Sequence, residues 1–269
     1  MRIKSYDIFG NIALVKFQEK FRESEKKKFA LNLIKENKSI KTVLEKTSKI
    51  RGRLRKFSTK FLAGENTKEV VYHENDCVFR FNIDNTYFSP RLSNERKEIA
   101  LKIKKDDNVL VLFAGVAPFS IVIAKKSRAK KVDSVEINRQ ASKYAELNVE
   151  LNRLKGRVNI IQADVKKLGK KLCKGRLSKG NHGCPRYDVI VMPRPQLKET
   201  FLSSVFPFAK KGTKIFYYDF CKIDEINLII EKIKKESEKS KKKIKILNIK
   251  EAGEIAPYKI RVRVDFEII

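Results

Sequence analysis

The sequence predicts an α/β protein in which a parallel sheet with helices on both faces follows a smaller α+β domain. From residue 108 to residue 219, apolar strand patterns alternate with helical patterns, and such alternation predicts parallel strands joined by crossover helices. The first strand breaks at Ala114-Gly115, and a helix begins at Pro118. One crossover later a second strand ends in an acid, Glu136. These two features predict a nucleotide-cofactor site at the carboxyl edge of the sheet.

The loop at Gly115 favours a cofactor without phosphates. It holds a single glycine, whereas Gly-x-Gly-x-x-Gly would let the backbone cradle a pyrophosphate. S-adenosylmethionine (SAM) therefore fits the pattern better than a dinucleotide does, and Glu136 would accept hydrogen bonds from its ribose. The alternative for the same residues is a plain buried strand and helix start.

The charge of the chain points to a polyanionic partner. The 269 residues are 42% hydrophobic, enough for a packed core, and their 62 Lys and Arg against 32 Asp and Glu give a formal net charge of +30. This excess predicts binding to nucleic acid. A lysine-rich proteome, or a thermophile with abundant surface charge, is the alternative.

We expect a cytoplasmic protein without a metal. No apolar run reaches the roughly 18 residues of a membrane span, and residues 1–7 lack the apolar core of a signal peptide. Cys173, His182 and Cys184 lie close together, which leaves a metal site, a local disulfide or an unliganded loop. The irregular spacing favours the unliganded loop.

Residues 1–84 are expected to form a small α+β domain that faces RNA. It would hold strands at 6–17 around Gly10-Asn11, a charged helix at 24–35, and further strands at 41–45, 50–64, 70–73 and 77–84. Arg51, Arg53 and Arg55 recur at period two, so on a strand they share one face. That basic face suits RNA phosphates, although a purely structural appendage is the alternative.

Residues 85–269 are expected to form the cofactor domain. A helix at 94–104 leads into strands at 108–113, 131–136, 157–161, 187–192 and 213–219, with helices from 118, at 138–152, a short one after 161, and at 198–208. An amphipathic helix at 225–243 and two last strands from 244 and 258 complete it. A sheet that ends in a late antiparallel hairpin is typical of SAM-dependent methyltransferases of the Rossmann-like class I.

Three segments of the chain carry recognisable motifs: Asn85-Thr-Tyr-Phe-Ser-Pro-Arg-Leu-Ser-Asn-Glu-Arg96, Phe113-Ala-Gly-Val-Ala-Pro-Phe-Ser120, and Ala256-Pro-Tyr before a strand. Together they resemble one family, the archaeal and eukaryal tRNA (guanine-37-N1)-methyltransferases. The resemblance runs from about Asp7 to the end of the chain. It implies a class I SAM-dependent (Rossmann-like) methyltransferase that acts on guanosine 37 in the anticodon loop of tRNA.

Carried over by position, the resemblance implies a set of cofactor-binding residues. Tyr87 and Arg96 would wall the site, Glu136 would bind the ribose, and Asp164 with Val165 would meet the adenine. A helix N-cap is an equal alternative for Asp164. The whole set is Tyr87, Arg96, Phe113, Ala114, Gly115, Val116, Glu136, Ile137, Asp164, Val165, Met192 and Pro193.

The reaction itself explains two further residues that the resemblance implies. Guanine N1 carries a proton, so the enzyme needs a general base and a group that stabilises the negative charge developing on O6. Glu95 matches the family's base and Arg55 its O6-stabilising arginine. A helix-start carboxylate and a phosphate contact are their respective structural alternatives.

The sequence departs from the family after the fourth strand, where the usual Asn-Leu-Pro is Pro193-Arg-Pro195. Proline has no amide donor, so Pro193 and Pro195 would shape a rigid wall for the base instead. The change suggests the archaeal bifunctional subgroup, which also methylates C7 of 4-demethylwyosine. The domain that precedes this region in many relatives, and contacts the outer corner of tRNA, is not expected here. The rival functions are the aminocarboxypropyl transferase of wyosine synthesis and a non-catalytic RNA-binding protein.

Overall fold

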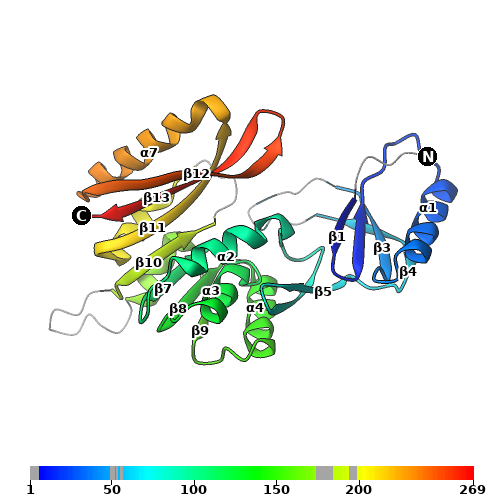
Figure 1. The fold of residues 1–269 in the computed structure, drawn as a ribbon, viewed down its shortest axis with the longest axis horizontal. Helices are drawn as coiled ribbons and strands as arrows, with labels where there is room; N and C mark the ends of the chain where they lie inside the picture. The colour runs from blue at the N-terminus through cyan, green and yellow to red at the C-terminus, as the bar shows by residue number, and fades with distance from the viewer. Residues whose placement is uncertain (1–5, 49–51, 53, 55–56, 174–183, 194–198) are drawn as a thin grey trace.

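The computed structural model describes residues 6–48, 52, 54, 57–173, 184–193 and 199–269. The larger part is a seven-stranded sheet in the order β12-β13-β11-β10-β7-β8-β9 (Figure 1). Strands β7 to β11 run parallel to one another, and β13 is antiparallel to both β11 and β12. Their bounds are β7 Asn108–Leu112, β8 Lys131–Glu136, β9 Val158–Gln162, β10 Tyr187–Met192, β11 Ala209–Lys222, β12 Ile244–Ala256 and β13 Lys259–Ile268.

Helices cover both faces of this sheet, as the alternating pattern predicts. In β7, Val109 and Val111 pack with α2, α3 and α4, whereas Leu110 and Leu112 pack with α5, α6 and α7. Successive strand residues point to opposite faces, so an all-apolar strand indicates a sheet covered on both sides. The helices are α2 Ser93–Leu101, α3 Pro118–Lys126, α4 Arg139–Leu151, α5 Leu168–Leu172, α6 Leu202–Val205 and α7 Ile226–Lys239.

The amino-terminal part is a separate four-stranded sheet with one helix (Figure 1). Ala30 and Leu33 of α1 pack on apolar residues of the sheet, including Val15 and Val43. The sheet has the order β1-β2-β3-β4, with bounds β1 Tyr6–Phe9, β2 Ile12–Val15, α1 Glu23–Glu36, β3 Thr42–Lys46 and β4 Thr59–Gly64. Arg51, Arg53 and Arg55 lie outside the described residues, so the expected basic strand face does too.

A hairpin of β5 (Glu69–Glu74) and β6 (Cys77–Asn82) joins the two parts. Two asparagines, Asn148 of α4 and Asn152 at its C-cap, bind β6. Asn148 Oδ1 accepts from Arg80 N at 2.7 Å, and Asn152 Oδ1 accepts from Val78 N at 2.9 Å. Phe79 of β6 belongs to the same core cluster as α3 and α4. The hairpin is therefore anchored to the larger domain, although its sequence precedes the expected boundary at residue 84.

Two expectations for the larger domain are wrong. The helix expected at 198–208 is reduced to α6 and a 3₁₀ turn at Phe206–Phe208, because Phe201 is left-handed (φ 63°) and Pro207 has no N–H for a continuing helix. Cys173 and Cys184 form a disulfide with Cα atoms 4.8 Å apart, in place of an unliganded loop. Cys173 is the C-cap residue that ends α5, and Cys184 lies shortly before β10.

In the described ranges, no helix is both long and apolar enough to cross a membrane.

Candidate functional site

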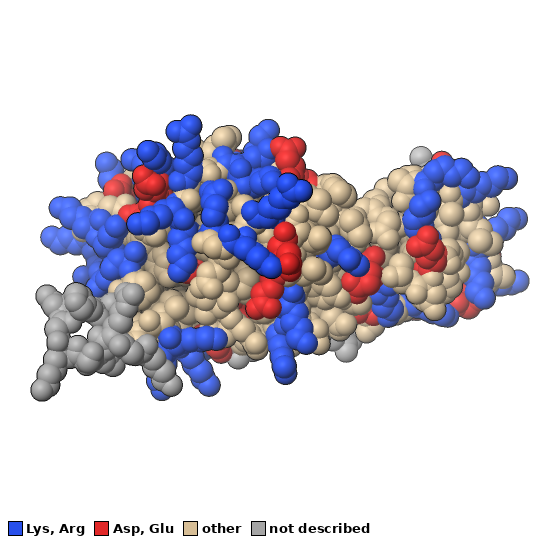
Figure 2. All heavy atoms as spheres, turned by 90° about the horizontal axis from the view of Figure 1, so that it is seen from below, with Lys and Arg blue, Asp and Glu red and all other residues tan. Residues whose placement is uncertain are grey.

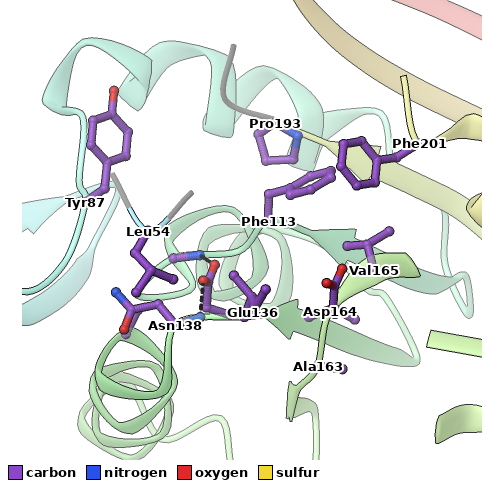
Figure 3. A pocket seen from close by; sticks show the side chains of 14 residues that line it. Leu54, Tyr87, Phe113, Glu136, Asn138, Ala163, Asp164, Val165, Pro193 and Phe201 are labelled. Carbon is purple, nitrogen blue, oxygen red and sulfur yellow. Dashed lines mark hydrogen bonds between the residues drawn. The ribbon is translucent and has the colours of Figure 1, made fainter. Parts of the chain in front are cut away.

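A pocket lies where β7, β8, β9 and β10 end, at the carboxyl edge of the sheet (Figure 3). Its empty volume, including the open mouth, is about 740 Å³. The residues that line it come from loops far apart in sequence. They are Leu54, Tyr87, Phe113, Gly115, Val135, Glu136, Ile137, Asn138, Ala141, Ala163, Asp164, Val165, Pro193 and Phe201.

The loop after β7 turns sharply over the pocket floor. Phe113, Gly115 and Ala117 all have left-handed backbone conformations, with φ of 53°, 58° and 65°. A Cβ at Gly115 would lie 3.2 Å from the carbonyl oxygen of Tyr87. Glycine at this position therefore serves both the turn and the close approach of the Tyr87 segment.

Glu136 lies at the centre of the pocket floor, between the Gly115 turn and the start of α4 (Figure 3). Its Oε2 accepts from Gly115 N and its Oε1 accepts from Asn138 N, both at 2.7 Å. Burial raises the pKa of this carboxyl, and the backbone donors act in the opposite direction. Each oxygen has a second lone pair, so the carboxylate can also accept from hydroxyls of a ligand.

Asn138 couples this floor to the loop that carries Tyr87. Its Oδ1 caps α4 by accepting from Gln140 N at 3.0 Å, and its Nδ2 donates to Asn85 O at 2.9 Å. Asparagine is a preferred N-cap because it satisfies a helix donor that has no partner in the helix. The same side chain thus fixes both the helix start and the wall of the pocket.

The side of the pocket away from Tyr87 is mainly apolar. Phe113 and Phe201 meet edge to face with ring centroids 5.3 Å apart, and Val165 lies near them (Figure 3). Asp164 lines this side and caps the 3₁₀ turn Val165–Lys167 by accepting from Lys166 N at 3.0 Å. Flat apolar walls with one acid beside them suit a purine ring that carries an exocyclic amine.

Eight of the expected cofactor residues line this pocket, and four others do not. Ala114, Val116 and Met192 are buried in the two cores that pack against the sheet. Arg96 is 1% exposed and binds Glu74 through two contacts of 2.5 Å. It therefore ties α2 to β5. The lining residues of the expected set are Tyr87, Phe113, Gly115, Glu136, Ile137, Asp164, Val165 and Pro193.

Of the expected catalytic residues, the structure describes Pro193 and Glu95, whereas Arg55 and Pro195 lie outside the described residues. Pro193 follows β10 and lines the pocket. Glu95 does not line it; this residue is 6% exposed and accepts from Tyr218 Oη at 2.9 Å. Tyr217 pairs in register with Met192, so the backbone of Tyr218 lies one residue beyond the last paired position of β10.

Sequence reasoning missed several lining residues, among them Leu54, Asn138 and Phe201. Asn138 carries a usable signal, because an asparagine after a strand that ends in an acid is a strong N-cap before the helical pattern. Phe201 carries none, because its place depends on a left-handed backbone (φ 63°) directly before α6.

Basic side chains spread over both domains on the face that Figure 2 shows, and acidic side chains are fewer there than basic ones. This agrees with the formal net charge of +30. Such a surface attracts polyanions at long range.

Replacing Gly115 by alanine tests the close approach at the turn. Gly115→Ala should weaken nucleoside binding about 10-fold. The new Cβ would meet the Tyr87 carbonyl oxygen, and alanine also adopts the left-handed backbone conformation at a cost in free energy that glycine does not have. Gly156→Ala is the matched control, since Gly156 is also left-handed (φ 82°) but a Cβ there meets nothing within 4 Å. Calorimetric titration with SAM measures both, and equal affinities for the two variants would contradict the close approach.

Two family models match the chain, and the residues that they match do not overlap. The model described as "TRM5/TYW2 methyltransferase domain" matches residues 70–247, and the one described as "TYW2 N-terminal domain" matches residues 2–67. The match to the first begins at the β5–β6 hairpin, which α4 binds.

Whole-chain comparisons give relatives of the same kind. The chain is 31% identical to tRNA (guanine(37)-N(1))/4-demethylwyosine(37)-methyltransferase Taw22 of Nanoarchaeum equitans, over 98% of this chain and 100% of the relative. The crystal structure of Trm5b from Pyrococcus abyssi superposes with a TM-score of 0.84 at 30% identity, covering 99% of this chain and 75% of that one. Trm5 of Methanocaldococcus jannaschii in complex with adenosine gives 0.79 at 25% identity, covering 98% and 72%.

Proposed function

The chain belongs to the TRM5/TYW2 methyltransferase family, and we propose that it transfers a methyl group from SAM to N1 of guanosine 37 in tRNA. The observation that carries this proposal is the pocket at the carboxyl edge, where Glu136 faces a single-glycine turn. A tRNA substrate also accords with the net charge of +30 and with the cytoplasmic location expected from the sequence.

The residues of the pocket fit SAM in shape and chemistry. Glu136 would bind the ribose hydroxyls, while Ile137, Phe113 and Val165 would sandwich the adenine beside Asp164. The turn at Gly115 has one glycine and no basic side chain for phosphates. When bound, SAM supplies an electrophilic methyl group. The chain's part is to orient that methyl group toward the target base and to exclude water.

The acceptor chemistry requires a general base and a group that stabilises negative charge. Glu95 would take the proton from guanine N1, and Arg55 would stabilise the charge on O6. Arg55 belongs to the basic segment before β4, next to Leu54, which lines the pocket. Pro193, with Pro195, would provide a flat wall for the base.

C7 methylation of 4-demethylwyosine is a second candidate activity. The relative from Nanoarchaeum equitans carries both activities in its name and aligns over its whole length. Pro193 stands where the family pattern has an asparagine. Without the side-chain amide of that asparagine, the pocket would have room for the larger tricyclic base.

Methyl transfer to defined tRNAs tests both activities. We expect labelled methyl from SAM to enter tRNA with guanosine 37 and not the same tRNA with adenosine 37. Transfer to tRNA that carries 4-demethylwyosine would support the second activity, and no product there would remove it. Addition of an aminocarboxypropyl group would identify the rival transferase, and binding without any product would favour a non-catalytic RNA-binding protein.

Affinity for tRNA should fall steeply with salt. If six or so phosphates are neutralised, raising the salt from 50 to 200 mM lowers affinity about 1,000-fold because counterions are released. The affinity for SAM, which has no phosphates, should change less than 3-fold over the same range. Filter binding and calorimetry measure the two, and a flat tRNA response would contradict electrostatic capture.

A further inference from the structure

Three residues in one row across the sheet bind the carboxylate of Glu95. Arg263 of β13 pairs in register with Tyr218 of β11 on one side and with Lys250 of β12 on the other. Tyr218 Oη donates to Glu95 Oε2 at 2.9 Å, and Arg263 Nη1 donates to the same oxygen at 2.7 Å. Lys250 Nζ lies 2.8 Å from the other oxygen, Oε1.

The two oxygens of Glu95 therefore have unlike surroundings. The Oε2 partners are fixed in the interior, since the Arg263 side chain is 0% exposed and Tyr218 is 1% exposed. The Oε1 partner lies nearer the solvent, because the Lys250 side chain is 40% exposed, and it is shared with a second carboxylate, Glu98. An ammonium on a long flexible stem can be displaced at low cost, whereas a buried guanidinium fork cannot.

Further contacts lock Arg263 in place. Its Nε donates to Asp265 Oδ1 at 2.7 Å, and its Nη2 donates to Glu98 Oε1 at 2.7 Å. Burial opposes the charge of Arg263, but these carboxylates outweigh it and raise the pKa of the guanidinium. A side chain held on both flanks in this way directs its remaining N–H group at Glu95.

We propose that Tyr218 and Arg263 are positioning residues that hold Glu95 Oε2, so that Oε1 is the atom that receives the N1 proton of guanine. The inference rests on the proposed function. On binding, the base would displace Lys250 from Oε1. The N1–H bond then breaks, its proton goes to Oε1, and its electron pair on N1 forms the bond to the methyl carbon as the carbon–sulfur bond of SAM breaks toward sulfur.

Tyr218→Phe tests this with the loss of one hydroxyl. We expect kcat to fall about 10-fold with an unchanged KM for SAM, because one donor to the carboxylate is lost. Lys250 and Arg263, the other two partners of this carboxylate, remain in the variant.

Tyr187→Phe is the matched control. Tyr187 is also buried, and its hydroxyl donates at 2.8 Å to a buried carboxylate, Asp133, which does not line the pocket. This variant should lose comparable thermal stability and keep the wild-type kcat and KM for SAM. If Tyr218→Phe matches Tyr187→Phe in kcat, the hydroxyl only supports the fold and the inference is wrong.

Arg263 is tested by a conservative pair. Arg263→Lys keeps a charge but not the fork, so we expect it to lower kcat about 100-fold, and Arg263→Met to lower it further. Lys102→Met, which removes a partner of Asp265 but no partner of Glu95, should leave kcat unchanged. Equal activity of the two Arg263 variants and wild type would overturn the positioning role. If wild-type protein methylates no tRNA, the proposed function fails first and the inference with it.

Discussion

Glu95→Gln should lower kcat for methyl transfer about 1,000-fold while the affinity for SAM stays within 3-fold of wild type. Glutamine has nearly the same shape, yet its amide cannot take a proton from guanine N1. Glu95 does not line the pocket that would hold SAM, so its loss should leave cofactor binding intact. Single-turnover kinetics with tRNA and calorimetry with SAM separate the two quantities.

The variant will also be less stable, and the control must match that loss. The negative charge of Glu95 pairs with Arg263 and Lys250. Glutamine is uncharged, so the substitution would leave these two cations with less negative charge beside them. Asp133→Asn is a suitable control, because Asp133 is 7% exposed and accepts from Tyr187 Oη at 2.8 Å and Asn159 Nδ2 at 2.9 Å. It should lose stability without losing kcat. A Glu95→Gln enzyme as fast as Asp133→Asn would show that Glu95 is not the base.

Glu136→Ala should weaken SAM binding at least 100-fold and abolish turnover at ordinary cofactor concentrations. Two hydrogen bonds from ribose hydroxyls to a carboxylate are worth about 3 kcal/mol together, which corresponds to that loss. The N–H groups of Gly115 and Asn138 also lose their acceptor, so the Gly115 turn should loosen.

Asp188→Ala removes a carboxylate of the same kind from the opposite edge of the sheet. Asp188 Oδ2 accepts from Asn108 N at 2.8 Å where β7 begins, and the residue does not line the pocket. We expect this variant to keep its SAM affinity. Glu136→Gln retains one acceptor oxygen and is measured beside Glu136→Ala. If both variants bind SAM as tightly as wild type, Glu136 does not bind the ribose.

The parts of the site that follow from local sequence were predictable. A strand that breaks at a glycine, and a second strand that ends in Glu136, lie together in the structure because parallel neighbours end at the same edge. Tyr87 and Asp164 were expected from the family resemblance, and both line the pocket.

Other parts depend on pairings between distant segments, for which one sequence holds little signal. The contacts of Glu95 with Tyr218 and Arg263 span 123 and 168 residues, and they exist only because β11 and β13 pair in one register. The attachment of the β5–β6 hairpin to Asn148 and Asn152 is similar, since asparagines within a helical pattern indicate no particular partner. Phe201 reaches the pocket through a left-handed backbone that its residue type does not favour.

The most direct test of the account is nucleoside-resolved mass spectrometry of a defined tRNA after incubation with the protein and SAM. We expect position 37 to gain the mass of one methyl group and to co-migrate with 1-methylguanosine, with no change when Glu95→Gln replaces the wild-type protein under single-turnover conditions. An unmodified guanosine 37, or a methyl group at any other position, would contradict the central claim.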